Sequence, residues 1–146
     1  MTFLILQIAV PFIWFGLVGG ISFLETPLKF RAPNITLPLG LGIGRIVFSA
    51  LNKVELALAA LLLLSFFFAR PETKFALFFY GIITFLLILQ TVWLLPALNA
   101  RAAAVISESF AASSSTHFIY IAFEAIKFIL LPVLGVSFMS SYLKFE

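Results

Sequence analysis

The charged residues that could do chemistry lie inside apolar stretches of this chain. Residues 40–64, GLGIGRIVFSALNKVELALAALLLL, place Arg45, Asn52 and Glu55 on one stripe, because a helix turns about 100° per residue. Glu55 comes ten positions after Arg45, which is about 15 Å deeper and near the middle of a hydrocarbon layer about 30 Å thick. An ionisable group at that depth is costly, so we treat Glu55 as a candidate contact for a substrate, a proton or an ion.

The last apolar segment has a matching polar pattern. HFIYIAFEAIK, residues 117–127, can be laid over RIVFSALNKVE, residues 45–55. The alignment suggests two helical hairpins in tandem, an arrangement from which some membrane transporters build a site between their halves. Chance similarity between apolar segments is the alternative. The aligned polar positions are Arg45 with His117, Asn52 with Glu124, and Glu55 with Lys127.

If the repeat is real, the second and fourth helices face each other and form one polar cluster inside the membrane. Its expected members are Arg45, Asn52, Glu55, His117, Glu124 and Lys127. Glu55 is expected to pair with Lys127 near mid-depth, because a lone ion in lipid is unfavourable. Arg45 is expected to pair with Glu124 nearer the membrane surface. For each of these residues the alternative to a functional role is a structural ion pair that locks the bundle.

Other polar residues are expected near the membrane surfaces. Glu25, Lys29 and Arg31 are expected to line the mouth of the same cavity, with solvation of a loop as the alternative. His117 opens its helix beside a Ser/Thr run, which favours a capping or interfacial role. The two tryptophans, Trp14 and Trp93, are predicted to serve in packing and as interfacial anchors.

Composition places the chain in a membrane and excludes several kinds of site. Of 146 residues, 63% are hydrophobic and only 10% are charged, and the mean hydropathy is +1.20, far above that of a soluble domain. There is no Cys, no Asp and a single His, so we expect no metal and no cofactor. The net charge of +3 is scattered, and we infer no nucleic-acid site.

The elements that must position these residues are predicted to be helices. Four apolar runs, residues 3–24, 41–68, 75–95 and 118–138, are long enough to cross a membrane. Because unpaired backbone groups are costly in lipid, we predict an all-α integral membrane four-helix bundle in a single domain, residues 1–146. A short interfacial helix is predicted within residues 98–112, before the last span.

Two glycine pairs are predicted to let helices approach each other closely. Gly16 and Gly20 are four residues apart in the first span, and Gly40 and Gly44 have the same spacing at the start of the second. Small residues at this spacing recur where membrane helices pack, although the pattern is common.

The motifs GLVGGISFLETPLKF (residues 16–30), GRIVF (44–48) and LLPALNARAAA (94–104) together resemble the small four-helix membrane proteins related to transmembrane protein 205. This resemblance implies a membrane bundle and hardly any mechanism, and the present chain lacks a long insert before the last helix. NKVELALAALLLL, residues 52–64, also resembles the Asn-x-x-Glu segment of the membrane-associated eicosanoid and glutathione enzymes. Their usual His is Ala50 here, and residues 75–95 contain no Arg or Lys that could hold a thiol cofactor.

Three classes of function follow, and whether the chain is an enzyme stays open. Permeation of a small solute, an ion or a proton, through a polar site between the second and fourth helices, is favoured, because paired buried charges are present without a recognisable catalytic set. The alternatives are a membrane enzyme acting on a lipophilic substrate and a scaffold or accessory subunit. We expect an integral protein of a bacterial inner or plasma membrane, in contact with the lipid bilayer, assembled as a homo-oligomer and able to take a small-molecule or lipid ligand.

Overall fold

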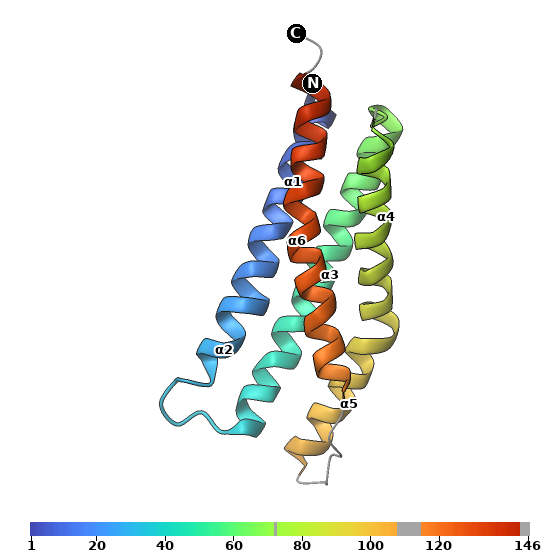
Figure 1. Cartoon of the computed structure of the whole chain (residues 1–146). Coiled ribbons are helices and arrows are strands. Elements are labelled where there is room, and N and C mark those ends of the chain that lie inside the picture. Colours follow the sequence, from blue (N-terminus) through green and yellow to red (C-terminus); the bar gives the residue numbers. More distant parts are fainter. Residues whose placement is uncertain (72, 108–114, 144–146) are drawn as a thin grey trace.

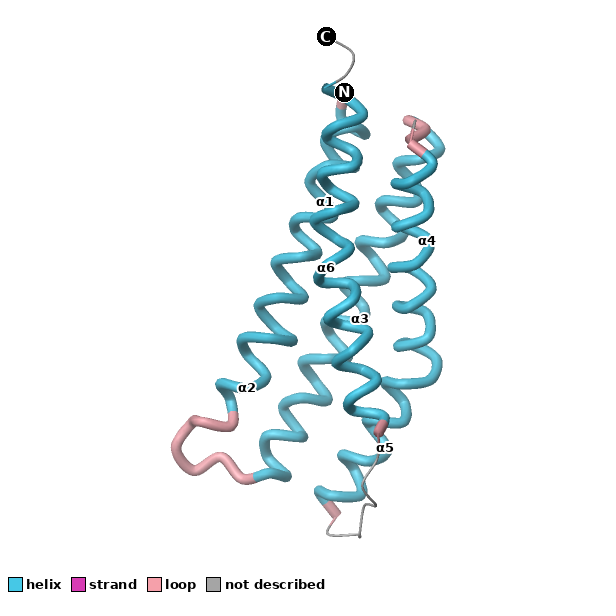
Figure 2. Tube along the Cα trace, in the orientation of Figure 1, coloured by secondary structure: helices cyan, strands magenta, loops and turns pink. Residues whose placement is uncertain are grey.

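The computed structural model describes residues 1–71, 73–107 and 115–143, and these residues form four long helices without strands (Figures 1 and 2). All four helices are long and apolar enough to cross a membrane. The predicted all-α four-helix membrane fold is therefore confirmed. The helices extend beyond the apolar runs, and their bounds are Thr2–Lys29, Leu37–Phe68, Lys74–Ile106 and Thr116–Leu143.

Two of the four helices contain a π-helical insert. The second and fourth spans are α3 (Leu37–Phe68) and α6 (Thr116–Leu143). The first span consists of α1 (Thr2–Val18), the π-helix η1 (Gly19–Glu25) and α2 (Thr26–Lys29). The third span consists of α4 (Lys74–Leu89), the π-helix η2 (Gln90–Leu94) and α5 (Leu95–Ile106). The segment predicted as an interfacial helix is thus helical up to Ile106 and continues the third span, while residues 108–112 lie outside the described part.

Each of the two inserts is followed by a proline that accounts for it. Pro27 lies in the first turn of α2 and Pro96 in the first turn of α5. A proline has no N–H and clashes with the carbonyl four residues earlier, so the preceding turn widens. The N–H of Thr26 accordingly bonds to the carbonyl of Ile21, five residues back. Both hairpins share this layout, which agrees with the predicted tandem arrangement.

Consecutive spans run antiparallel, and both termini lie at the same end of the bundle (Figure 1). Around the bundle, α1 packs against α6 and α3, α4 packs against α6, and α5 packs against α3. The helices α3 and α6 are therefore parallel and diagonal to each other. Only long side chains can join them across the centre.

The contact between the first span and α6 depends on two glycines that accept aromatic rings, Gly19 at the start of η1 and Gly135 on α6. A Cβ on Gly19 would lie 2.8 Å from the ring of Phe128, and a Cβ on Gly135 would lie 2.7 Å from the ring of Phe12. Phe128 also stacks on Phe15, with ring centroids 4.3 Å apart. Each of the two spans therefore has a glycine against which an aromatic ring of the other packs.

Of the two glycine pairs singled out in the sequence, one behaves as predicted. A Cβ on Gly40 would lie 2.2 Å from the ring of Phe30, and one on Gly44 would lie 3.2 Å from Nζ of Lys29. The pair therefore seats α2 and the turn after it on α3. Gly16 and Gly20 have open space beside them, so the prediction of close packing there is wrong.

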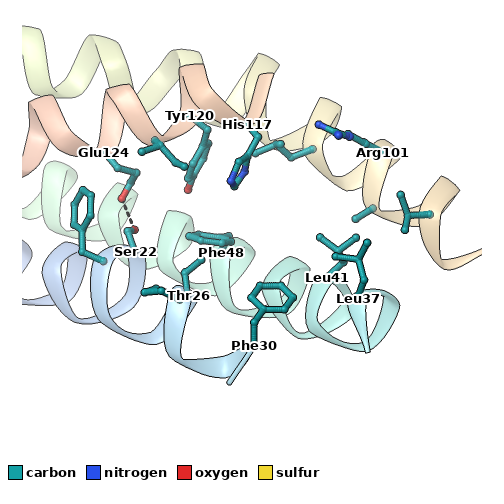
Figure 3. A pocket seen from close by; sticks show the side chains of 16 residues that line it. Ser22, Thr26, Phe30, Leu37, Leu41, Phe48, Arg101, His117, Tyr120 and Glu124 are labelled. Atoms are coloured by element: carbon teal, nitrogen blue, oxygen red, sulfur yellow. Dashed lines mark hydrogen bonds between the residues drawn. The ribbon is translucent and has the colours of Figure 1, made fainter. Parts of the chain in front are cut away.

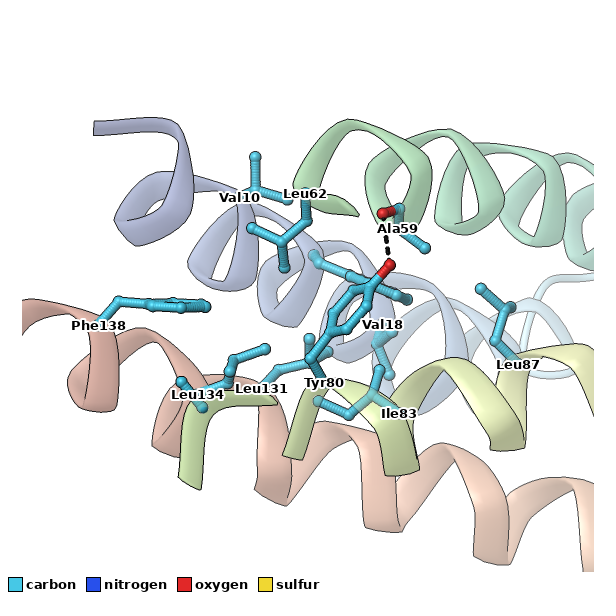
Figure 4. Close-up of a cluster of buried hydrophobic side chains, with 12 residues drawn as sticks. Val10, Val18, Ala59, Leu62, Tyr80, Ile83, Leu87, Leu131, Leu134 and Phe138 are labelled. Carbon is cyan, nitrogen blue, oxygen red and sulfur yellow. Dashed lines mark hydrogen bonds between the residues drawn. The ribbon is translucent and has the colours of Figure 1, made fainter. Parts of the chain in front are cut away.

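The half of the bundle near the termini is filled by an apolar core (Figure 4). The hydroxyl of Tyr80 donates a hydrogen bond to the carbonyl oxygen of Ala59 at 2.9 Å, which joins α4 to α3. On the outer surface large apolar side chains remain exposed, including Phe67 and Phe118. A surface of this kind is expected for helices that face lipid. The core side chains include Val10, Trp14, Val18, Leu62, Ile83, Leu87, Leu131, Leu134 and Phe138.

Candidate functional site

Three charged side chains meet at the centre of the bundle. Nζ of Lys127 on α6 lies 2.6 Å from Oε1 of Glu55 on α3 and 2.8 Å from Oε1 of Glu124, one turn away on α6. All three side chains are at most 1% exposed. The predicted pairing of Glu55 with Lys127 is confirmed, and we call Glu55, Glu124 and Lys127 the charge triad.

The first and third spans complete the coordination of the charge triad. The indole N–H of Trp14 donates to Oε1 of Glu55 at 2.7 Å. The hydroxyl of Ser22 donates to Oε2 of Glu124 at 2.6 Å, and the amide of Gln90 donates to Oε1 of Glu124 at 2.7 Å. Ser22 belongs to η1 and Gln90 to η2. Both π-helical segments thus aim a polar side chain at the same carboxylate, and such inserts are frequent at functional sites.

Asn52 is buried near the charge triad but binds a different partner. Its amide donates to Oγ1 of Thr91 at 3.0 Å, and Thr91 in turn bonds to the carbonyl of Leu87 at 2.8 Å. Asn52 therefore ties α3 to η2, one turn from Glu55.

The buried oxygen atoms at the site differ in whether they accept a hydrogen bond. Within the described part of the chain, Oε2 of Glu55 and Oε1 of Gln90 are buried and have no hydrogen-bond partner. An acceptor buried without a donor is unfavourable and invites an explanation. The unpaired Glu55 oxygen is the point at which the charge triad could accept a proton or a donor group.

A pocket of about 590 Å³ leads from the charge triad toward the end of the bundle opposite the termini. Figure 3 shows Glu124 and Ser22 at one end of this pocket and Arg101 and Leu37 at the other. The wall on α6 carries His117, Tyr120 and Glu124 at helical spacing, so these three side chains share one face. Glu124 belongs both to the pocket wall and to the charge triad.

His117 lies at the outer part of this wall, exposed at the start of α6. It lines both the large pocket and a smaller adjoining pocket of about 100 Å³. The prediction that His117 joins the polar cluster of Glu55, Glu124 and Lys127 is wrong, because His117 is seven residues before Glu124 on α6, about 10 Å away along the helix, and is exposed. Its interfacial role stays a prediction.

The predicted pairing of Arg45 with Glu124 is wrong. Glu124 lies within a hydrogen bond of Lys127, which contacts Glu55, so it sits at the depth of Glu55. Arg45 is ten residues earlier on α3, about 15 Å away along the helix, and is exposed. Arg45 lines the smaller pocket instead.

The three residues predicted to line the cavity mouth differ in where the structure places them. Lys29 lines the smaller pocket and forms an ion pair of 3.4 Å with Glu25. Its Nζ also lies 5.4 Å from the centroid of the Phe48 ring. Arg31 is exposed and lines neither of these two pockets. Only Lys29, with Glu25 as its partner, therefore belongs to the mouth.

Several residues of the site were not predicted from the sequence. Trp14 is completely buried in the core and binds Glu55. The predicted packing role is therefore confirmed for Trp14 and the interfacial role is wrong, whereas Trp93 is 52% exposed. Ser22 and Gln90 could have been found in the sequence, because Ser22 stands between apolar neighbours and Gln90 forms with Thr91 a polar pair inside an apolar run. A neutral polar side chain in a membrane span is itself a candidate for an interhelical hydrogen bond.

Comparison of the chain with protein-family models, with curated proteins and with solved structures finds no match. The two family resemblances drawn from the motifs therefore stay predictions, and any functional proposal must stand on the geometry of the site.

Proposed function

We propose that this chain mediates permeation of protons or of a small solute across the membrane, with the charge triad as the binding site. The observation that carries the proposal is the charge balance at the bundle centre. Two carboxylates face one ammonium group in a site at most 1% exposed. If all three are ionised, the site is short of one positive charge, and one bound proton or one cationic group would balance it.

A continuous chain of polar contacts supports entry from the pocket. Glu124 lines the pocket, Lys127 bonds to Glu124 at 2.8 Å, and Glu55 bonds to Lys127 at 2.6 Å. A proton arriving at Glu124 can therefore redistribute to Glu55, whose second oxygen accepts no hydrogen bond within the described residues. The groups that face Glu55 from the packed elements are Trp14, Lys127 and, through Lys127, Glu124.

The other side of the charge triad is closed. Beyond it lies the apolar core, in which Leu62, Ile83 and Leu131 are completely buried. Passage therefore requires the two hairpins to move relative to each other, as in transporters that expose one central site to each side in turn.

A structural role is the second candidate, and the same contacts favour it. The charge triad and its neutral partners join α1, η1, α3, η2 and α6. A network of this kind can serve as a lock that fixes helix register without binding a solute. The two functions differ in what happens when the charge is removed without loss of the fold.

Flux through reconstituted protein tests the proposal. Purified protein in liposomes is loaded with a pH-sensitive dye, proton influx is driven by a potassium diffusion potential, and a broad solute panel is run in parallel. We expect Glu55→Gln and Lys127→Met each to reduce the flux that the unaltered protein supports by about tenfold or more, since the binding group is gone. Lys53→Gln is the matched control, because Lys53 is exposed on the same helix two positions before Glu55.

The assembly is checked by size-exclusion chromatography of every variant. No flux of protons or of any solute through the unaltered protein, or unchanged flux in both triad variants, contradicts the proposal and leaves the structural role. A loss of flux in Lys53→Gln equal to that in Glu55→Gln also contradicts it.

A further inference from the structure

The hydroxyl of Tyr120 is a polar group inside the bundle that the charge triad does not use. Tyr120 is only 3% exposed and lines the pocket of about 590 Å³. Figure 3 shows its hydroxyl pointing from α6 into this pocket. Within the described part of the chain the hydroxyl forms no hydrogen bond. A polar group that is buried in this way calls for a partner, and a molecule in the pocket would supply one.

The other neutral polar side chains of the pocket already have partners or reach water. The hydroxyl of Ser22 donates to Glu124 at 2.6 Å, and that of Thr26 donates to the carbonyl oxygen of Ile21 at 3.0 Å. His117 is exposed at the start of α6, so water can bond to it. A ligand therefore gains most at Tyr120, because a hydrogen bond there replaces no bond within the protein.

The pocket around this hydroxyl has the size and lining of a site for one small molecule. Its volume of about 590 Å³ lies within the usual range of about 300–1,000 Å³ for such sites. Ten of its sixteen lining residues are apolar. The ring of Phe48 meets that of Tyr120 edge to face, with centroids 5.4 Å apart. An apolar wall with one available polar group binds a mostly apolar ligand and fixes its orientation.

The charged residues that line the pocket do not favour an ionic ligand. The carboxylate of Glu124 already accepts hydrogen bonds from Ser22, Gln90 and Lys127. Arg101, at the outer end, also takes part in an interaction. An ion among the apolar side chains would lose its water without a free partner of opposite charge, which is costly. The lining therefore suits a neutral molecule.

We infer that the pocket binds a neutral, largely apolar molecule whose oxygen atom accepts a hydrogen bond from the hydroxyl of Tyr120. The apolar body of the ligand packs against Phe48 and Ile121, which line the same pocket. Ketones, esters and alcohols have an oxygen of this kind, and hydrocarbons do not. Tyr120 is thus the residue that distinguishes an oxygen-bearing ligand from a hydrocarbon of the same shape.

The inference goes beyond the proposed function and does not depend on it. The hydroxyl of Tyr120 makes no hydrogen bond to the charge triad within the described residues. A neutral ligand can therefore bind whether the charge triad carries a proton or only locks the bundle. Binding is measured by labelling and without any flux, so that neither result decides the other.

Benzophenone tests the site, because its carbonyl is both the accepting oxygen and the photoreactive group. The purified full-length protein is irradiated with benzophenone in non-ionic detergent, and the labelled peptides are mapped by mass spectrometry. We expect saturable labelling next to Tyr120 on α6 and Phe48 on α3.

Competitors of the same shape separate the oxygen atom from the apolar body. Benzhydrol has a hydroxyl where benzophenone has its carbonyl, and diphenylmethane has a methylene group there. We expect benzhydrol to compete about fivefold better than diphenylmethane, since one hydrogen bond separates them. Diphenylacetate and benzhydryltrimethylammonium, which are charged, are expected not to compete at the concentrations at which benzhydrol does.

Tyr120→Phe removes the hydroxyl and keeps the ring. We expect labelling to weaken by about fivefold, and benzhydrol and diphenylmethane to compete equally. The melting temperature is expected to stay unchanged, because the hydroxyl makes no hydrogen bond within the described residues. Tyr80→Phe is the matched control. It loses the bond to the carbonyl of Ala59 in the apolar core, so the melting temperature is expected to fall while labelling stays unchanged.

A second pair of variants tests whether the pocket holds the ligand. Leu98→Trp fills the pocket and is expected to reduce labelling by about tenfold or more, whereas Leu64→Trp, on the exposed face of α3, leaves it unchanged. Val105→Trp, at another lining position, replaces Leu98→Trp if that variant misfolds.

Three results overturn the inference. The first is labelling that does not saturate or that lies outside the pocket. The second is equal competition by benzhydrol and diphenylmethane in the unaltered protein. The third is labelling of Tyr120→Phe, or of the folded pocket-filling variant, at the level of the unaltered protein.

Discussion

At the scale of single residues, Lys127 determines what the centre of the bundle can do. Its ammonium group is completely buried and touches two carboxylates, one from its own helix and one from α3. Removal of one partner from a buried ion pair costs about 3–5 kcal/mol, because the remaining charge is left without compensation. The charge triad therefore combines a structural requirement with an excess of one carboxylate, which is the basis of the permeation proposal.

The hydrogen bond from Trp14 to Glu55 gives a prediction at this scale. Trp14→Phe keeps an aromatic ring but removes the N–H that lies 2.7 Å from Oε1 of Glu55. We expect the free energy of unfolding to fall by about 1–2 kcal/mol, since the acceptor is a carboxylate and the site is buried. Chemical denaturation in detergent, followed by circular dichroism, measures the change.

Trp93→Phe provides the control for this measurement. Trp93 is 52% exposed, and we expect a change within about 0.5 kcal/mol. Equal destabilisation by the two substitutions would show that the bond to Glu55 contributes nothing particular.

At the scale of elements, the two π-helical segments position the polar partners of Glu124. Each precedes a proline in the first turn of the following helix, and each carries one donor to Glu124, Ser22 in η1 and Gln90 in η2. The prolines were visible in the sequence and marked the same position in both hairpins. The widened turns could not be predicted from the sequence, because hydrophobic periodicity does not distinguish one α-helical turn from one π-helical turn.

The glycines of α3 give a prediction at the scale of helix packing. A Cβ at position 40 would lie 2.2 Å from the ring of Phe30, which is also part of the pocket wall. Gly40→Ala is expected to lower stability by about 1–2 kcal/mol through overpacking, offset only where Phe30 can swing outward. Thermal unfolding in detergent reports the difference.

The matched substitution is Gly16→Ala on α1, where the space beside the glycine is open. We expect it to be neutral or to stabilise the helix by up to about 1 kcal/mol, since alanine is the better helix former. Similar losses at both positions would contradict the packing that distinguishes the two glycine pairs.

At the scale of the whole molecule, the bundle is divided along its length. The half near the termini is a closed apolar core (Figure 4), and the opposite half contains the pocket (Figure 3). The charge triad lies between them. Membrane location, helix number and the Glu55–Lys127 pair could be predicted, because length, composition and the cost of a lone ion in lipid determine them.

The pocket and the partners of Glu124 could not be predicted in the same way. They depend on which helices are diagonal in the bundle. They also depend on whether the side chains of η1 and η2 lie at the same depth as the charged residues of α3 and α6. The mistaken pairing of Arg45 with Glu124 went against the alignment, which sets Glu124 beside Asn52, seven residues or about 10 Å along the helix from Arg45. It assumed that Arg45 needs an acidic partner inside the bundle, whereas Arg45 is exposed.

The most direct test of the central claim separates binding from locking in one variant. Lys127→Met alone leaves two buried carboxylates without a cation, and the addition of Glu55→Gln removes one of them. We predict that Lys127→Met lowers the free energy of unfolding by about 3–5 kcal/mol. The double variant is expected to recover part of this loss, because one of the two uncompensated carboxylates is gone and that of Glu124 remains, while its flux in liposomes stays as low as in Glu55→Gln. Recovery of both stability and flux to the values of the unaltered protein would contradict the account, because the charge triad would then act only as a structural lock.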